Sequence, residues 1–344
     1  MTEQAAAIPK GSLVLITGLT GYIATHVAQQ FFDRGYKVRG TVRDLSKASW
    51  LKDDLFRAEH AAGNLELVQV PDLGAPDAFG TAVKGVDAVA HIATIASFDP
   101  DPNNVIPQTV SGAVSVLRAA ASEPSVKRVV FTSSVGAAMM PIAGASGHVG
   151  RDTWNDAAVQ AAWAPPPYEA SRGMITYIAS KVEAEKAVWK FYQDEKPNFV
   201  LNVVSPFTTL GTVLHPSHQR GTAGWVPGLY KGDAGQISQV GTMPSLVYVN
   251  VKDVALLHVA TILDKDTKEE RIQAWAGPFK WNDVLAIFRR LYPGQKFPDD
   301  FPESAAITAT TDDSVGLKLL KKWAQQDDWR NLEDTVRENL SGLS

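Results

Sequence analysis

The 344-residue sequence contains no cysteine. This absence excludes disulfide bonds, zinc sites built from thiolates and cysteine nucleophiles, and it is compatible with a reducing compartment. No stretch reaches the roughly 18 apolar residues that a membrane-spanning helix needs. Residues 1–10 contain only a short apolar run, which predicts a flexible tail rather than a signal or transit peptide. We therefore expect a cytoplasmic protein without a membrane segment.

The sequence also has little net charge. Its 33 basic and 37 acidic side chains give a formal net charge of −4. A protein that binds nucleic acid or an anionic membrane electrostatically would show a basic excess, so neither partner is expected. We expect a small-molecule partner instead, and the sequence leaves open whether the protein is a monomer or a homodimer.

Short runs of β-branched residues alternate with longer segments of helical periodicity. Helical spacing covers 23–34, 105–121 and 177–193, and each segment ends near a glycine or proline. This alternation is typical of an α/β fold with a doubly wound parallel sheet of the Rossmann type. The strand candidates are Leu13–Thr17, Val38–Val42, Leu65–Val70, Val86–Ile92, Arg128–Thr132 and Val200–Val204.

The texture of the sequence changes after Pro206, where proline and glycine become frequent and periodicity weakens. We therefore expect a Rossmann domain at 11–206, joined by about 245–262. A smaller, irregular substrate-binding region is expected at 207–244 and 263–344.

The first strand candidate leads directly into a glycine-containing turn. It reads Thr17-Gly18-Leu19-Thr20-Gly21-Tyr22-Ile23-Ala24, and helical periodicity begins within it. Gly18 and Gly21 allow a tight turn and the close approach of a pyrophosphate to backbone N–H groups at a helix N-terminus. Ala24 allows close packing of that helix on the sheet. A second strand follows about 20 residues later, which the dinucleotide-binding interpretation requires.

The end of the second strand indicates which nicotinamide cofactor binds. An NAD enzyme typically carries an acid there for the ribose 2′-hydroxyl, whereas an NADP enzyme carries cations for the 2′-phosphate. Thr41 stands where the acid would be, and Arg43 and Lys47 follow it. The guanidinium of Arg43 can bind a phosphate in a bidentate way, so NADP(H) is favoured. Asp44 leaves the ribose acid of an NAD enzyme as the alternative.

A tyrosine and a lysine spaced i, i+4 on a helix could deliver a proton to a carbonyl oxygen, because the cation favours the phenolate. Four pairs have this spacing, and their tyrosines are Tyr177, Tyr192, Tyr248 and Tyr292. Proline follows Tyr292 directly and follows Tyr192 closely, and Tyr248 lies in a strand-like run. Only Tyr177, paired with Lys181, begins a regular helix after the fifth strand.

The fifth strand closes with the polar triplet Thr132-Ser133-Ser134. Ligands of open α/β sheets bind at the carboxyl ends of the strands. We therefore predict that Ser134 and Tyr177 converge on one carbonyl oxygen, with Lys181 assisting.

The glycine turn, the Thr-Ser-Ser strand end, the Tyr177–Lys181 pair and Ser205-Pro206 together resemble the extended short-chain dehydrogenases. Within that family the sequence is similar to the yeast and fungal NADPH-dependent aldehyde or carbonyl reductases, which are themselves similar to dihydroflavonol reductases. The resemblance extends from Gly11 to about Trp329. It implies reduction of aldehydes and ketones by NADPH, with Ser134 polarising the carbonyl and Lys181 also binding the nicotinamide ribose.

The same resemblance implies further binding residues. The cofactor would contact Thr17, Gly18, Thr20, Gly21, Tyr22, Ile23, Arg43, Lys47, Asp72, Leu73, Ala93, Thr94, Thr132, Tyr177, Lys181, Pro206, Thr208 and Thr209. A pocket for a bulky carbonyl substrate would be lined by Phe98, Phe207, Trp225, Met243 and Leu246. One departure from the family pattern is the stretch Thr109-Val110-Ser111-Gly112-Ala113, where many members carry an asparagine before a Gly-Thr pair.

Two other functions keep the same fold. One is an NAD-dependent sugar-nucleotide epimerase or dehydratase, and the other is a non-catalytic, NADP-binding regulatory protein. The intact Ser134, Tyr177 and Lys181 argue against the regulatory protein. No metal site is expected, because His215 and His218 lie in a loop with no third ligand near them in the sequence.

Overall fold

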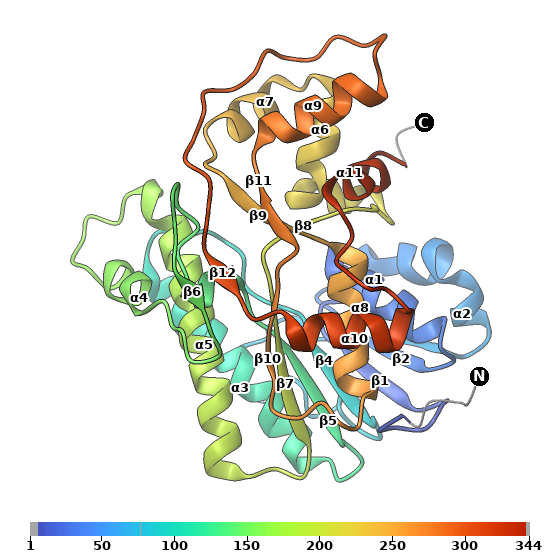
Figure 1. Ribbon diagram of the computed structural model, residues 1–344. Coiled ribbons are helices and arrows are strands. Elements are labelled where there is room, and N and C mark those ends of the chain that lie inside the picture. The colour runs from blue at the N-terminus through green and yellow to red at the C-terminus, as the bar shows by residue number, and fades with distance from the viewer. Residues whose placement is uncertain (1–5, 76, 342–344) are drawn as a thin grey trace. The chain divides into compact units, whose positions relative to one another are not determined.

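The computed structural model of the chain describes residues 6–75 and 77–341, and Figure 1 shows its helices and strands. The chain forms two compact units. The first consists of residues up to 139, 152–205 and 258–272, and the second of 140–151, 206–257 and 273 onwards.

The first unit is built on a seven-stranded sheet with the order β10-β7-β5-β4-β1-β2-β3. Its strands are β1 (Leu13–Ile16), β2 (Lys37–Val42), β3 (Leu65–Gln69), β4 (Ala88–His91), β5 (Arg128–Thr132), β7 (Val200–Pro206) and β10 (Arg271–Ala274). All pairs from β7 to β3 are parallel. The predicted doubly wound parallel sheet is therefore confirmed, and β10 is a strand that the sequence pattern did not predict.

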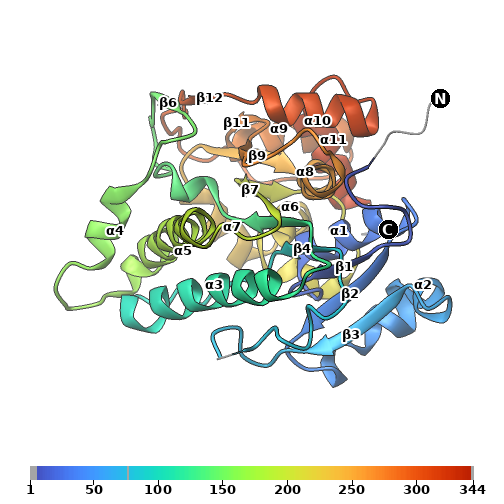
Figure 2. The same cartoon turned by 90° about the horizontal axis from the view of Figure 1, so that it is seen from below.

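The helices of this unit cover both faces of the sheet. They are α1 (Tyr22–Phe32), α2 (Arg57–Ala61), α3 (Ile106–Ser122), α4 (Asp156–Ala162), α5 (Gly173–Glu195) and the part of α8 (Val251–Leu263) from His258 on. Shorter helical turns are η1 (Ser46–Ala48), η2 (Leu51–Leu55), η3 (Pro102–Asn104), η4 (Val135–Ala137) and η5 (Ala170–Arg172). Figures 1 and 2 show α3 and α5 side by side on one face and α1 on the other.

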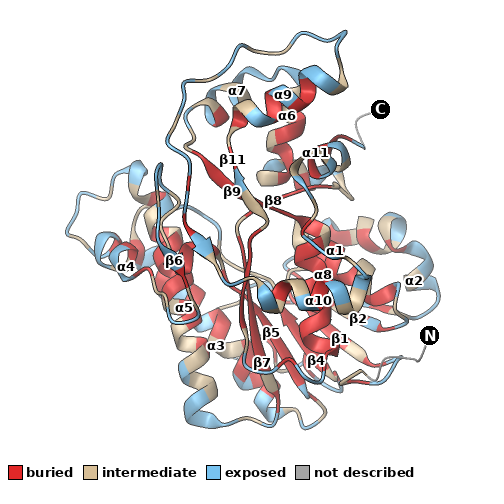
Figure 3. Cartoon of the chain, in the orientation of Figure 1, coloured by how far each residue is buried: buried red, intermediate tan, exposed pale blue. Residues whose placement is uncertain are grey.

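The core of the first unit explains why its strands are so apolar. Both faces of the central strands are covered, so β4 and β5 consist only of buried residues, and Figure 3 shows the strands as buried. Between the sheet and the helices α3 and α5, Phe131 and Leu201 pack with Leu117 and Val188 in one cluster. This packing fixes the face of α5 that is turned to the sheet.

The second unit contains a three-stranded sheet with the order β11-β9-β8. Its strands are β8 (Thr208–Leu210), β9 (Leu246–Asn250) and β11 (Gly277–Phe279), and a separate pair joins β6 (His148–Val149) to β12 (Thr310–Thr311). Its helices are α6 (Trp225–Lys231), α7 (Ala234–Gly241), the start of α8, α9 (Trp281–Leu291), α10 (Ser314–Ala324) and α11 (Leu332–Leu340), with short turns η6 (Pro216–Arg220) and η7 (Thr222–Gly224). Trp281, Phe288 and Leu229 lie in its core.

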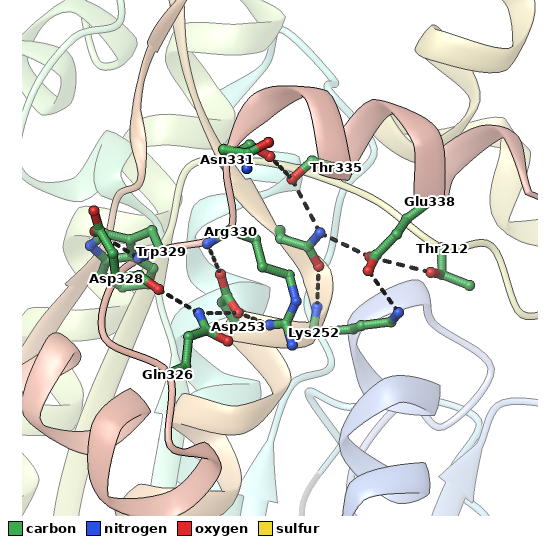
Figure 4. Close-up of polar contacts among 11 residues, drawn as sticks. Thr212, Lys252, Asp253, Gln326, Asp328, Trp329, Arg330, Asn331, Thr335 and Glu338 are labelled. Carbon is green, nitrogen blue, oxygen red and sulfur yellow. Dashed lines mark hydrogen bonds and ion pairs between the residues drawn. The ribbon is translucent and has the colours of Figure 1, made fainter. Parts of the chain in front are cut away.

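A polar network, drawn in Figure 4, holds the C-terminal segment of the second unit. The fully buried carboxylate of Asp253 accepts a hydrogen bond of 2.9 Å from the backbone N–H of Arg330 and pairs with its guanidinium. Glu338 on α11 accepts hydrogen bonds from Lys252 at 2.9 Å and from Asn250 at 3.0 Å. These contacts join the chain after residue 326 to the end of β9 and the start of α8.

The structure divides the chain differently from the sequence analysis in several places. Residues 140–151, expected in the Rossmann domain, belong to the second unit, and residues 263–272, expected in the substrate region, belong to the first. Residues 245–257 belong to the second unit, because β9 pairs with β8 and β11 rather than with the large sheet. The expected tail lies outside the described residues over 1–5, whereas Ile8 is buried and its carbonyl accepts a hydrogen bond from the Tyr36 hydroxyl. Ala6 forms a β-bridge with Asp264. Over the described residues, no helix is long and apolar enough to cross a membrane.

Candidate active site

The glycine turn between β1 and α1 has the geometry of a phosphate-binding loop. Gly18 has a φ of +67°, and a Cβ at this position would lie 3.1 Å from the Cβ of Ala93. The N–H of Gly21 donates to the carbonyl of Gly18 at 2.9 Å. Gly21 is the N-cap of α1 and has no side chain that could bind the N–H groups of the first helical turn. The positive end of the helix is thus available to an anion.

Thr17 and Thr41 hold this turn in place from within the sheet. The hydroxyl of Thr17 accepts hydrogen bonds of 3.0 Å from the backbone N–H groups of Ile92 and Ala93. Its own proton therefore donates to Nδ1 of His91, at 2.9 Å. The hydroxyl of Thr41 accepts from the N–H of Gly18 at 3.0 Å, so the residue at the position of the ribose acid supports the turn instead.

The cations predicted for the 2′-phosphate follow β2 directly. Arg43 and Lys47 are exposed. The carboxylate of Asp44 accepts hydrogen bonds from the backbone N–H of Ser46 at 2.9 Å and from its hydroxyl at 2.6 Å. These bonds lower the pKa of Asp44, and Lys47 lies 3.8 Å from its other oxygen. Asp44 is therefore engaged with the turn that follows it, whereas a ribose acid would need a carboxylate directed at the cofactor.

A small cavity lies between the ends of the strands and α3. Its lining consists of Leu73, His91, Ala93, Thr94, Ile95, Gln108, Thr109, Gly112, Ala113, Phe131 and Lys181. The hydroxyl of Thr94 is buried there without a hydrogen-bond partner among the described residues. The Thr109 hydroxyl donates to the carbonyl of Val105, the N-cap of the same helix, at 2.8 Å. Its proton is therefore used locally, unlike that of the asparagine amide found in many family members. Asp72 is exposed and accepts from the N–H of Gly74 at 2.9 Å.

These features fit a nicotinamide dinucleotide. The turn would hold the pyrophosphate at the N-terminus of α1, the orphaned Thr94 hydroxyl would find a partner, and Arg43 would bind the 2′-phosphate. Pro206, Thr208 and Thr209, which were also predicted to bind the cofactor, lie in β7 and β8, and Thr209 donates to the carbonyl of Phe207 at 3.2 Å.

The three predicted catalytic side chains all belong to the first unit. Ser134 is the N-cap of η4 directly after β5, where its hydroxyl accepts from the N–H of Gly136 at 3.1 Å, and it lies close enough to Tyr177 to lower the pKa of the tyrosine. Lys181 lies one turn after Tyr177 in α5, is only 2% exposed, and donates to the carbonyl of Thr132 at 3.1 Å. The end of β5 and one face of α5 therefore bring a serine, a tyrosine and a lysine together.

Burial dominates the electrostatics of this group. It raises the pKa of Tyr177 to about 12, while the nearby Ser134 side chain acts in the opposite direction. It lowers the pKa of Lys181 to about 8, and the carboxylate of Glu185 opposes that shift. It also lowers the pKa of His91 to about 3, with a smaller contribution from the charge of Lys181. At neutral pH the tyrosine is thus protonated, the lysine charged and the histidine neutral.

The start of α5 packs tightly against the loop that carries Phe98. A Cβ on Gly173 would overlap the carbonyl oxygen of Phe98, and the hydroxyl of Thr176 donates to the carbonyl of Pro100 at 3.1 Å. The ring of Phe98 lies 5.2 Å from that of Tyr177 and is 46% exposed. An exposed aromatic ring beside the tyrosine offers an apolar contact to a molecule bound there.

The other predicted pocket residues belong to the second unit and pack within it. The ring of Phe207 contacts that of Trp275 at 5.8 Å, and the ring of Trp225 contacts that of Trp281 at 6.0 Å. Leu246 is part of the core, and Met243 packs against it. Their role in binding a substrate stays a prediction.

Sequence reasoning missed Glu185, which lies on the same face of α5 as Tyr177 and Lys181. Its carboxylate is fully buried and accepts a hydrogen bond of 2.6 Å from the hydroxyl of Ser133. The signal was available in part, because residue 185 continues the i, i+4 spacing from Tyr177 through Lys181.

The first unit combines a dinucleotide-binding turn after β1 with a tyrosine-lysine pair on α5, both beside the same doubly wound sheet. This combination is typical of a nicotinamide-dependent enzyme. Residues 14–273 match the model of the NAD dependent epimerase/dehydratase family, and the chain belongs to that family. The family resemblance predicted from the sequence is thereby confirmed.

Several curated proteins are similar to this chain over nearly its whole length. NAD-dependent epimerase/dehydratase terH of Aspergillus terreus is 40% identical over 98% of both chains. Aldehyde reductase 2 of Sporidiobolus salmonicolor is 38% identical, covering 97% of this chain and 96% of the relative. Ketoreductase adrE of Penicillium rubens is 37% identical over 99% of both.

Solved structures share the fold over the same extent. Gre2 of Candida albicans, solved in complex with NADPH, has a TM-score of 0.79 and 25% identity, covering 96% of this chain and 97% of that one. The yeast methylglyoxal/isovaleraldehyde reductase Gre2, also complexed with NADPH, has a TM-score of 0.78 and 24% identity over 96% of this chain and 97% of its own.

Proposed function

We propose that this enzyme reduces aldehydes and ketones to alcohols with NADPH, and that Tyr177 supplies the proton while Lys181 and Ser134 assist. Carbonyl reduction with NADPH agrees with the relatives named aldehyde reductase and ketoreductase and with the NADPH complexes of Gre2. The observation that carries the residue assignment is the buried ammonium of Lys181, which lies one helical turn after Tyr177 on α5 and donates to the carbonyl of Thr132, two residues before Ser134.

The reaction needs a hydride on the carbonyl carbon and a proton on its oxygen, and bound NADPH supplies the hydride. A carbonyl oxygen that lies between Ser134 and Tyr177 accepts hydrogen bonds from both hydroxyls, which polarises the carbonyl bond. Tyr177 then gives up its proton to the alkoxide oxygen. The charge of Lys181, one helical turn away, stabilises the phenolate as it forms.

NADPH is favoured over NADH by the residues that follow β2. Arg43 is exposed at the end of the strand, and the carboxylate of Asp44 is bonded to Ser46. An epimerase or dehydratase that retains bound NAD would need an acid for the ribose 2′-hydroxyl. Analysis of the nucleotide released from the purified protein would distinguish the two functions, since tightly retained NAD would support the epimerase.

The proposal is tested by mixing the protein with NADPH and a panel of aldehydes and aryl ketones, and following the absorbance of NADPH. Replacing Tyr177 with phenylalanine should lower kcat by about 10²- to 10⁴-fold. Tyr192→Phe removes a hydroxyl from the same helix whose partner is the Glu269 carboxylate, and it serves as the control. Equal turnover of Tyr177→Phe and wild type would contradict the assignment of the acid.

Other expectations accompany this function. Four of them stay predictions. They are a substrate pocket that includes Phe98 near Tyr177, a division into cofactor and substrate regions, a cytoplasmic location, and a monomer or homodimer. Substrate panels on Phe98→Ala, cell fractionation and sedimentation would test them.

A further inference from the structure

Three side chains line one face of α5 at successive helical turns. Tyr177, Lys181 and Glu185 are spaced i, i+4 and i+8, so they lie above one another along the helix. Glu185 is 0% exposed. The proposed reaction uses only the first two, which leaves the buried carboxylate at the third position without a function.

The carboxylate of Glu185 is bonded on both oxygens. Oε1 accepts from Nε of Arg271 at 2.6 Å, and Oε2 accepts from the hydroxyl of Ser133 at 2.6 Å. The indole of Trp189 donates to Oε1 at 3.3 Å. Since Ser133 directly precedes Ser134, Glu185 joins α5 to the strand end that carries the second hydroxyl of the site.

Arg271 is held as firmly as its partner. It lies in β10, donates to the carbonyl of Thr153 at 2.7 Å, and its guanidinium lies 4.0 Å from the ring centroid of Trp154. Buried ion pairs of this kind rarely stabilise a fold more than apolar residues of the same volume would, because both charges lose their hydration. Their presence behind a buried lysine therefore suggests a role in the site.

We propose that Glu185 is a positioning residue for the reduction, which keeps Lys181 charged inside the protein and fixes Ser133 and Ser134 relative to α5, while Arg271 holds and partly neutralises it. The proposal rests on the proposed function, because it concerns the same proton donor.

The charged and titratable groups around Lys181 determine how strongly its protonated form is favoured. His91 on β4 is neutral, since the Thr17 hydroxyl donates to its Nδ1, and so it adds no charge. Tyr177 precedes Lys181 and Glu185 follows it on α5, and Arg271 lies behind Glu185 on β10. Glu185 is therefore the one negative charge among these groups, and Arg271 is the positive charge that opposes its effect on Lys181.

This balance of charges predicts the order in which three proteins lose the Lys181 proton as the pH rises: Glu185→Gln first, the double variant next and wild type last. Glu185→Gln keeps the shape of the side chain and one acceptor oxygen for Arg271, while its amide NH2 can donate to the Ser133 hydroxyl. It leaves the charge of Arg271 without its carboxylate, so Lys181 loses its proton at lower pH. Glu185→Gln combined with Arg271→Met removes both charges and should recover part of that shift. The combined variant also avoids a buried charge without its carboxylate partner, so it keeps the test valid where the single variant loses stability.

The pH at which Lys181 loses its proton is measured in two ways. The first is the basic limb of kcat/KM for carbonyl reduction at saturating NADPH. The second uses the protein without cofactor, labelled with ¹³C-lysine, in which the resonance of Lys181 is the one missing from Lys181→Met. We expect Glu185→Gln to move both midpoints down by about one pH unit, with the double variant between it and wild type. Glu183→Gln, which removes a carboxylate from another face of α5, should leave both unchanged.

The outcomes separate the possibilities. Equal midpoints in all variants, with altered thermal stability alone, would make the pair merely structural and overturn the proposal. A midpoint of the double variant at or below that of Glu185→Gln would overturn the role given to Arg271. If the wild type reduces no carbonyl compound, the proposed function fails, whereas the order of the Lys181 resonances still tests the charge balance.

Discussion

The replacement of Arg43 by alanine tests the cofactor preference most directly. Arg43 is exposed after β2, so a 2′-phosphate bound there would stay partly hydrated and screened. A hydrogen bond to a charged group contributes about 1.5–3 kcal/mol, and exposure places Arg43 near the lower end. A loss of about 1.5 kcal/mol corresponds to a roughly tenfold rise in the KM for NADPH. The KM for NADH should stay nearly the same, since NADH lacks the phosphate.

The assay measures initial rates with each cofactor at saturating carbonyl substrate, at low and at high salt. Added salt should reduce the difference between wild type and Arg43→Ala, because the lost interaction is electrostatic. Arg57→Ala removes an exposed arginine whose Nε donates to the carbonyl of Asp53, and it serves as the control. Equal effects of Arg43→Ala on both cofactors would refute the phosphate argument.

Asp44 provides the opposite check on the same site. Asp44→Asn keeps an oxygen that can accept the two hydrogen bonds from Ser46 and removes only the negative charge. The KM for NADPH should therefore stay the same or fall. If Asp44→Asn instead lost its activity with NADH and kept its activity with NADPH, Asp44 would be the acid that binds the ribose.

Two further predictions concern the proposed proton donor and its supports, and a third concerns the stability of the glycine turn. Lys181 is charged below its pKa of about 8, so kcat for reduction should fall as the pH rises through that value, which a pH–rate profile measures. Gly173→Ala places a Cβ against the carbonyl of Phe98 and displaces the start of α5, so kcat should fall at least about tenfold while NADPH titrations show unchanged affinity. Gly40→Ala brings a Cβ to 2.8 Å from that of the buried Leu19, and thermal or denaturant unfolding should show a loss of about 1–3 kcal/mol.

The parts of the structure that the sequence predicted are those with local signals. Each central strand is a short apolar run with a helix after it, and the turn at Gly18 and Gly21 lies at the junction of the first pair. The choice of Tyr177 among four equal spacings also depended on local context: in the structure Tyr248 lies in β9 and Tyr292 follows the last residue of α9. Spacing along one helix or strand is enough for such predictions.

The division of the chain could not be read in this way. The run Leu246–Asn250 has the apolar composition of any fully buried strand, and nothing in it indicates which sheet it joins. It pairs with β8 and β11 in the small sheet, whereas β10 forms the edge of the large sheet beside β7. Pairing partners are chosen by contacts between distant segments, which a single sequence does not display.

The same limit explains why Glu185 was missed. Glu183 and Glu185 are two residues apart on one helix, and glutamates on helices are usually solvated, so the sequence gives no reason to treat them differently. Glu185 can be buried because Ser133 and Arg271, the latter 86 residues further along the chain, both bind its carboxylate. Arg271 in turn belongs to the strand that was not predicted. The burial of Glu185 behind the proposed catalytic lysine thus depends on a partner strand, and a role for this carboxylate can be proposed only when the sheet is complete.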